Sequence, residues 1–172
     1  MIKLFRSVFD THRYLFADLD GTLIDTKSGK LFPKDKNDWV LKNDVIKAIK
    51  KYDPEYLFIA SNQGGIEKGF VKLDDFIQKI TSICKEIHSE IPGLVIAYRY
   101  CSSNDKNNYN RKPNPGMIED LMDVYDCRKS QCLMIGDASG LSGQFSDSDK
   151  KCAENADIKY MDINEFVEKY GR

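Results

Sequence analysis

The chain lacks several features that would assign it to a class at once. Its five cysteines are odd in number and include no Cys-x-x-Cys spacing, which argues against a disulfide framework and favours a reducing compartment. Its apolar runs are no longer than a strand, and its first residues lack the apolar stretch of a signal peptide. We therefore expect an intracellular protein without a membrane partner, in the cytoplasm or alternatively in the nucleus.

A strong charge imbalance is also missing. The 26 basic and 27 acidic residues leave a net charge of −1, so any contact with a polyanion has to come from a local patch. No Gly-x-x-x-x-Gly-Lys-Ser/Thr motif occurs, so the chain has no nucleotide-phosphate loop of that type.

What the sequence does contain is an alternation of strands and helices. At 172 residues the chain is long enough for one domain, residues 1–172, with a sizeable core. Apolar runs predict a first strand that starts at residue 14, delivers Asp18 and Asp20 at its carboxyl end and is broken by Gly21, and further strands at 56–60, 94–98, 132–135 and 158–160. Helical patterns cover 45–52, 72–91 and 114–125, with further helices from 149 and 164. This order predicts an α/β fold, a doubly wound Rossmann-like parallel sheet, with no insertion long enough for a large cap domain.

Reactive side chains stand next to the predicted strand ends. In an open parallel sheet, ligands bind in the crevice outside the carboxyl ends of the strands. Four groups of polar side chains follow such an end or precede a helix: Asp18 and Asp20, Ser61 and Asn62, Lys112, and Asp137. We expect the fold to bring them into one pocket.

Three neighbouring carboxylates require a cation, and oxygen ligands suit Mg²⁺. We expect Asp18 and Asp137 to bind Mg²⁺, and Lys112 and the Ser61 hydroxyl to hold a phosphoryl group. Asp18 would then attack phosphorus to form an aspartyl-phosphate, while Asp20 protonates the leaving oxygen and later deprotonates water. The predicted activity is two-step hydrolysis of a phosphomonoester.

The chain resembles the haloacid dehalogenase superfamily in four motifs, which occur in the family's order: Asp18-x-Asp20-Gly21-Thr22, Ser61, Lys112 and Gly136-Asp137. The resemblance spans residues 15–166. It implies Asp18 as nucleophile, Asp20 as acid/base, and Mg²⁺ held by Asp18, the backbone carbonyl of Asp20, and Asp137. Asp149 is either a further acid near the metal or the N-terminal charge of its helix.

Two branches of this superfamily without large caps fit the chain. The histidinol-phosphate and heptose-bisphosphate phosphatase group is similar in Ser61-Asn62-Gln63 and in the segment from Arg111 to Met117. That group carries a zinc loop with four ligands, of which this chain retains one, Cys101. We therefore expect no structural zinc.

The polynucleotide kinase 3′-phosphatase family is the other branch, and it is similar in the segment that follows the first motif. The string Thr26-x-Ser28-Gly29-Lys30-x-Phe32-Pro33, followed by Asp38-Trp39, looks like this family's flap. This similarity favours a nucleic-acid 3′ end as substrate over a small molecule. A non-catalytic phosphate-binding module and a phosphotransferase are the alternatives of other classes, but both acidic residues of the first motif are present and no cap shields an intermediate from water.

For substrate binding we assign Thr22, Asn62, Arg111 and Trp39. Arg111 adjoins Lys112, and a guanidinium pairs with phosphate through two hydrogen bonds. Trp39, the single tryptophan, either stacks on a base or anchors the flap. Five further basic residues are candidates for contacts with flanking phosphates: Lys30, Lys34, Lys36, Arg99 and Lys106.

Overall fold

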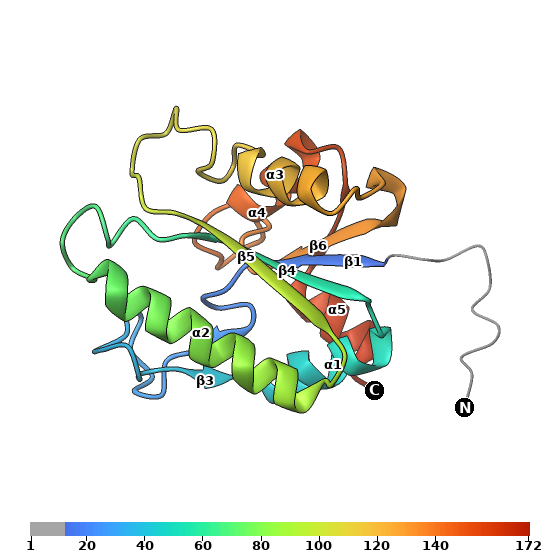
Figure 1. Ribbon diagram of the computed structural model, residues 1–172, viewed down its shortest axis with the longest axis horizontal. Coiled ribbons are helices and arrows are strands. Elements are labelled where there is room, and N and C mark those ends of the chain that lie inside the picture. Colours follow the sequence, from blue (N-terminus) through green and yellow to red (C-terminus); the bar gives the residue numbers. More distant parts are fainter. Residues whose placement is uncertain (1–12) are drawn as a thin grey trace.

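A computed structural model describes residues 13–172 of the chain (Figure 1). The first twelve residues of the predicted domain, on which the expectation about a signal peptide rests, lie outside the described part. Within residues 13–172, no helix combines the length and apolar character that a membrane crossing requires.

One parallel sheet forms the centre of the fold. Its order is β5-β4-β1-β6-β7, so the chain starts in the middle, builds one side of the sheet, and then crosses back to build the other. The strands are β1 (Tyr14–Ala17), β4 (Tyr56–Asn62), β5 (Val95–Cys101), β6 (Cys132–Gly136) and β7 (Lys159–Asp162). This arrangement confirms the predicted doubly wound sheet, and its switch point lies at β1.

Helices cover both faces of the sheet (Figure 1). On one face α1 (Asn43–Tyr52), α2 (Leu73–Glu90) and α5 (Ile163–Tyr170) pack over a core that includes Leu15, Ile59 and Ile135. On the other, α3 (Gly116–Val124) and α4 (Ser148–Asn155) pack over Phe16 and Phe58, and a short 3₁₀ turn (Lys129–Gln131) precedes β6. Burial on both faces explains why β1 reads as a continuous apolar run.

The flap (residues 26–39) is closed at its base by two short strands that the sequence did not predict. The segments on either side of it pair as the antiparallel strands β2 (Ile24–Asp25) and β3 (Val40–Leu41). Inside it, the Asp38 carboxylate accepts hydrogen bonds from the Ser28 backbone N–H at 2.8 Å, the Ser28 hydroxyl at 2.6 Å and the Lys34 N–H at 2.8 Å. Asp38 therefore orders the flap from within.

Helix α3 begins at Gly116, two residues after the start of the helical pattern predicted for 114–125, and Asn114 does not cap it. The Asn114 amide instead donates to the backbone carbonyls of Lys106 at 3.0 Å and Asn108 at 2.8 Å, because the loop before the helix needs partners for these groups.

Candidate active site

Three carboxylates meet at the carboxyl edge of the sheet. Asp18 follows β1, Asp137 follows β6, and Asp149 lies in the first turn of α4. Each offers an oxygen that lies within 4.8 Å of the other two. The Asp18 backbone N–H donates to the Ile135 carbonyl at 3.2 Å, so the pairing of β1 with β6 fixes where the Asp18 side chain begins.

Lys112 reaches this cluster from the loop between β5 and α3. Its Nζ lies 2.5 Å from Asp18 Oδ1 and 2.7 Å from Asp149 Oδ1, and all three side chains are buried or nearly so. Burial alone would lower the pKa of Lys112, but the carboxylates of Asp18 and Asp149 outweigh it and raise this pKa. Lys112 is therefore an ammonium ion held by two carboxylates.

One ammonium does not balance three carboxylates. Burial raises the pKa of Asp18, Lys112 lowers it, and Asp149 raises it again. Burial and the Asp149 charge also raise the pKa of Asp137. A compact cluster of oxygen ligands with excess negative charge is the donor set that Mg²⁺ takes. The residues therefore fit the cation that the sequence implied. The side chain of Asp20 lies outside this cluster.

Gly21 lies in the turn that follows Asp18, directly against the Asp137 side chain. This residue has a φ of +85°, and a Cβ on it would lie 2.3 Å from Asp137 Oδ2. Thr22 is fully buried, and its hydroxyl donates to Asp137 Oδ1 at 3.2 Å. The Thr22 hydroxyl therefore orients a carboxylate, and its assignment to substrate binding stays a prediction.

Ser61 and Asn62 end β4 beside the cluster. Ser61 is buried, and its Oγ accepts a hydrogen bond from Gln63 Nε2 at 2.8 Å. The Asn62 amide binds the Lys112 backbone on both sides, because it donates to the Lys112 carbonyl at 2.9 Å and accepts from the Lys112 N–H at 3.0 Å. The side chain that we assigned to substrate binding thus holds the backbone from which Lys112 projects.

Trp39 and Arg111 occupy different environments. Trp39 is only 8% exposed and belongs to the core next to α1, with Lys27 Nζ 5.8 Å from its ring centre. This burial favours Trp39 as an anchor of the flap, and its contact with substrate stays a prediction. Arg111 is partly buried and donates to the Ser103 carbonyl at 2.8 Å.

Sequence reasoning missed the partner of Asp20. Lys79 on α2 lies 2.9 Å from Asp20 Oδ1, although 59 residues separate the two in sequence. A signal was present: Lys79 follows the buried Phe76 by three positions and precedes the buried Ile83 by four, so it lies on the apolar face of its helix. A lysine on such a face needs a partner.

Asp149 combines the two roles that the sequence left open. It lies in the first turn of α4, and its carboxylate faces the cluster. Its Oδ2 also accepts the Ala138 N–H at 3.1 Å, so it ties the loop after β6 to Lys112.

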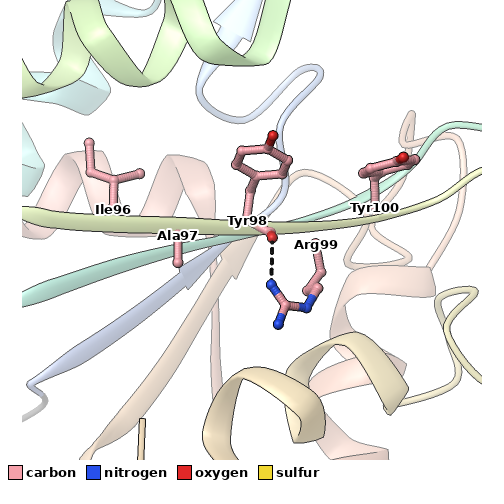
Figure 2. Close-up of a pocket in the computed structure, with 5 residues that line it drawn as sticks. All are labelled: Ile96, Ala97, Tyr98, Arg99 and Tyr100. Atoms are coloured by element: carbon pink, nitrogen blue, oxygen red, sulfur yellow. Dashed lines mark hydrogen bonds between the residues drawn. The ribbon is translucent and has the colours of Figure 1, made fainter. Parts of the chain in front are cut away.

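A hollow along the edge strand β5 lies apart from the carboxylates (Figure 2). It is lined by residues 96–100, and none of the predicted catalytic or metal-binding residues borders it. Arg99 points to the opposite side of the strand from Tyr98 and Tyr100 in Figure 2. Its guanidinium pairs with Asp120 and donates to the Tyr98 carbonyl at 3.1 Å, so an acidic side chain of the protein already balances its charge.

The parallel sheet brings carboxylates and Lys112 together at its carboxyl edge, as the four sequence motifs predict for a phosphatase. The family described as polynucleotide kinase 3 phosphatase matches residues 13–167. The chain therefore belongs to the polynucleotide kinase 3 phosphatase family.

Individual relatives agree with this placement. An uncharacterized 20.8 kDa protein of Autographa californica nuclear polyhedrosis virus is 31% identical, over 88% of this chain and 83% of that protein. A bifunctional polynucleotide phosphatase/kinase of Schizosaccharomyces pombe is 35% identical, over 91% of this chain and only 38% of that protein. The structure of a D,D-heptose 1,7-bisphosphate phosphatase from B. bronchiseptica, complexed with magnesium and phosphate, has a TM-score of 0.63 at 20% identity and covers 91% of this chain and 97% of that chain.

Proposed function

We propose that this phosphatase is Mg²⁺-dependent, acts through an aspartyl-phosphate at Asp18, and removes the 3′-phosphate from nucleic-acid ends. The observation that carries the proposal is the contact of Lys112 Nζ with Asp18 Oδ1 at 2.5 Å, within a cluster of three carboxylates. This contact orients the Asp18 oxygens and provides a positive charge beside the position of an attacked phosphoryl group.

The placement of these side chains supports a reaction in two steps. An Asp18 oxygen attacks phosphorus in line, and the bond from phosphorus to the leaving oxygen breaks as that oxygen takes a proton from Asp20. Water, deprotonated by Asp20, then attacks phosphorus and releases inorganic phosphate and free Asp18. Lys112 and Ser61 hold the phosphoryl oxygens during both steps.

Mg²⁺ would be held by Asp18, the backbone carbonyl of Asp20, and Asp137, and when bound it would offset the negative charge of the phosphoryl group. Asp149 would act on this site through Lys112, since its carboxylate is already bonded to that ammonium.

The flap supports a polymer end as the substrate. It is ordered by Asp38, and the Ser28 hydroxyl, followed by the Lys34 N–H, lowers the pKa of this carboxyl to about 2. It is tied to α2 by Lys36, which contacts Gln78 at 2.6 Å and Asp75 at 3.3 Å. Its tip exposes 82% of Leu31 and 76% of Phe32. An ordered flap without a large cap suits a substrate that extends beyond the site.

Exposed basic side chains also support a polymer end as the substrate. Within residues 13–172, no salt bridge engages the exposed Lys30, Lys34 or Lys106. Lys36 and Arg99, in contrast, are paired with acids. Each lysine that meets a backbone phosphate adds a contact that weakens as salt concentration rises.

A small phosphorylated metabolite is the second candidate substrate. The two hydrogen bonds between Asn62 and the Lys112 backbone join the two sequence segments that are similar to the heptose-bisphosphate phosphatase group. The loop after β5, where that group carries its zinc ligands, is held here by hydrogen bonds that involve asparagine side chains. Cys101 Sγ contacts Asn108 Oδ1 at 3.7 Å, and Asn104 donates to the Gly64 carbonyl at 2.8 Å.

A comparison of substrates tests the proposal. We would measure kcat/KM with Mg²⁺ for a 3′-phosphorylated oligonucleotide, a heptose bisphosphate, histidinol phosphate and p-nitrophenyl phosphate. Binding energy from remote parts of a true substrate should raise kcat/KM for the oligonucleotide at least about 100-fold above that for p-nitrophenyl phosphate. A higher value for either metabolite would refute the nucleic-acid assignment, and full activity after chelation of divalent cations would refute the Mg²⁺ dependence.

A further inference from the structure

A nearly buried lysine stands beside the proposed acid/base residue. The Lys79 side chain is only 8% exposed and projects from the face of α2 that carries Phe76, Ile80 and Ile83 into the core. Removing an ammonium from water costs several kcal/mol unless a partner compensates for the lost hydration, so Lys79 needs a partner in this position.

The partner is the Asp20 carboxylate, and both of its oxygens are engaged. Lys79 Nζ donates to Oδ1 at 2.9 Å, and it has no other hydrogen-bond partner within residues 13–172. Gln63 Nε2 donates to Oδ2 at 2.8 Å and lies equally close to Ser61 Oγ. The carboxylate is thus held by one hydrogen bond from α2 and one from the residue that follows β4.

These two hydrogen bonds matter because little else fixes the side chain of Asp20. Its side chain is 48% exposed, lies on the turn before Gly21, and takes no part in the cluster of Asp18, Asp137 and Asp149. An exposed carboxylate samples several rotamers, whereas an acid/base has to stay within hydrogen-bond reach of the leaving oxygen.

We propose that Lys79 is a positioning residue for proton transfer, which anchors Oδ1 of Asp20 and leaves Oδ2 as the oxygen that exchanges the proton. The inference rests on the proposed function. In the first step the Oδ2 proton moves to the leaving oxygen as its bond to phosphorus breaks, and in the second Oδ2 takes a proton from water. Gln63, a neutral donor, gives up its hydrogen bond to Oδ2 while the substrate is bound.

The competing explanation is that Asp20 merely neutralises a buried lysine. The two explanations differ in how the effect depends on the leaving group. An activated phenolate departs without a proton, but an alkoxide requires one, so loss of proton transfer affects alkyl esters far more than activated aryl esters. A general loss of folded protein would affect both equally.

The experiment compares two probes of similar size, p-nitrophenyl phosphate and benzyl phosphate. In Lys79→Met, kcat/KM for benzyl phosphate should fall about 100-fold, because a misplacement near 1 Å costs about that much, while the value for p-nitrophenyl phosphate should stay within about threefold. Lys79→Arg should restore most of the loss. Asp20→Asn should show the same selectivity for benzyl phosphate, and Lys85→Met, an exposed lysine on the same helix, should change neither value.

Equal losses for the two probes, or no loss for either, would overturn the role of Lys79 while leaving the phosphatase assignment intact. If Lys79→Met does not fold, Lys79→Gln keeps a donor of shorter reach and should show the same selectivity to a smaller degree; equal losses there would also overturn the role. A wild-type chain that hydrolyses neither probe would instead refute the proposed function.

Discussion

Gly21→Ala should lower kcat/KM about 100-fold by displacing one carboxylate. A Cβ at this position would lie 2.3 Å from Oδ2 and 2.9 Å from Cγ of Asp137, closer than nonbonded atoms approach. The Asp137 side chain has to move, and it then loses the Thr22 hydrogen bond of 3.2 Å that orients it. The variant thus changes the position of a proposed Mg²⁺ ligand without removing its charge.

The magnitude has two parts. A φ of +85° costs an alanine about 1–2 kcal/mol relative to glycine, which lowers the melting temperature of a domain of this size by about 2–4 °C per kcal/mol. Displacing Asp137 by about 1 Å should lower kcat/KM about 100-fold, because the reacting groups no longer meet in the required geometry.

Gly93→Ala separates the two parts. Gly93 has nearly the same φ, +88°, but no atom lies within 4 Å of its Cβ position, and it precedes β5 at the opposite edge of the sheet. Thermal unfolding and p-nitrophenyl phosphate hydrolysis at several Mg²⁺ concentrations would be measured for both variants. We expect a lower melting temperature for both variants and the loss of about 100-fold in kcat/KM for Gly21→Ala alone. Wild-type activity and Mg²⁺ dependence in Gly21→Ala would refute the reasoning.

Two other substitutions test the flap and the loop that holds Lys112. Asp38→Ala removes the acceptor of three flap hydrogen bonds, so KM for a 3′-phosphorylated oligonucleotide should rise about 10-fold with no change for p-nitrophenyl phosphate; equal changes in steady-state kinetics would contradict a substrate role of the flap. Asn62→Ala leaves the Lys112 backbone N–H and carbonyl unpaired, and kcat should fall about 10-fold for every substrate. An unchanged kcat would show that the loop holds Lys112 without Asn62.

The sequence predicts the reacting groups better than the residues that support them. Asp18, Ser61 and Asp137 follow apolar runs, and parallel strands place such positions at one edge, so their convergence follows from topology. The parallel, doubly wound sheet follows from the same alternation of elements, whereas its strand order was not predicted.

The supporting contacts depend on packing between distant segments. Asn62 binds Lys112 across 50 residues, and Lys79 binds Asp20 across 59, so no local pattern fixes either pair. Trp39 has an aromatic ring of the kind that stacks on a base, but in the structure this ring lies in the core, one residue before β3. A polar residue on an apolar helix face, as at position 79, is the one local sign of such a contact.

The rate at which Asp18→Asn releases phosphate tests the central claim most directly. Wild-type chain and variant would be compared on a 3′-phosphorylated oligonucleotide in the presence of Mg²⁺. Thermal unfolding of both would first establish that the variant is folded to the same extent as the wild type. The account predicts that the wild type releases inorganic phosphate and that the variant is slower by at least about 10³-fold, since it lacks the nucleophile. Phosphate release by Asp18→Asn at the wild-type rate would contradict it.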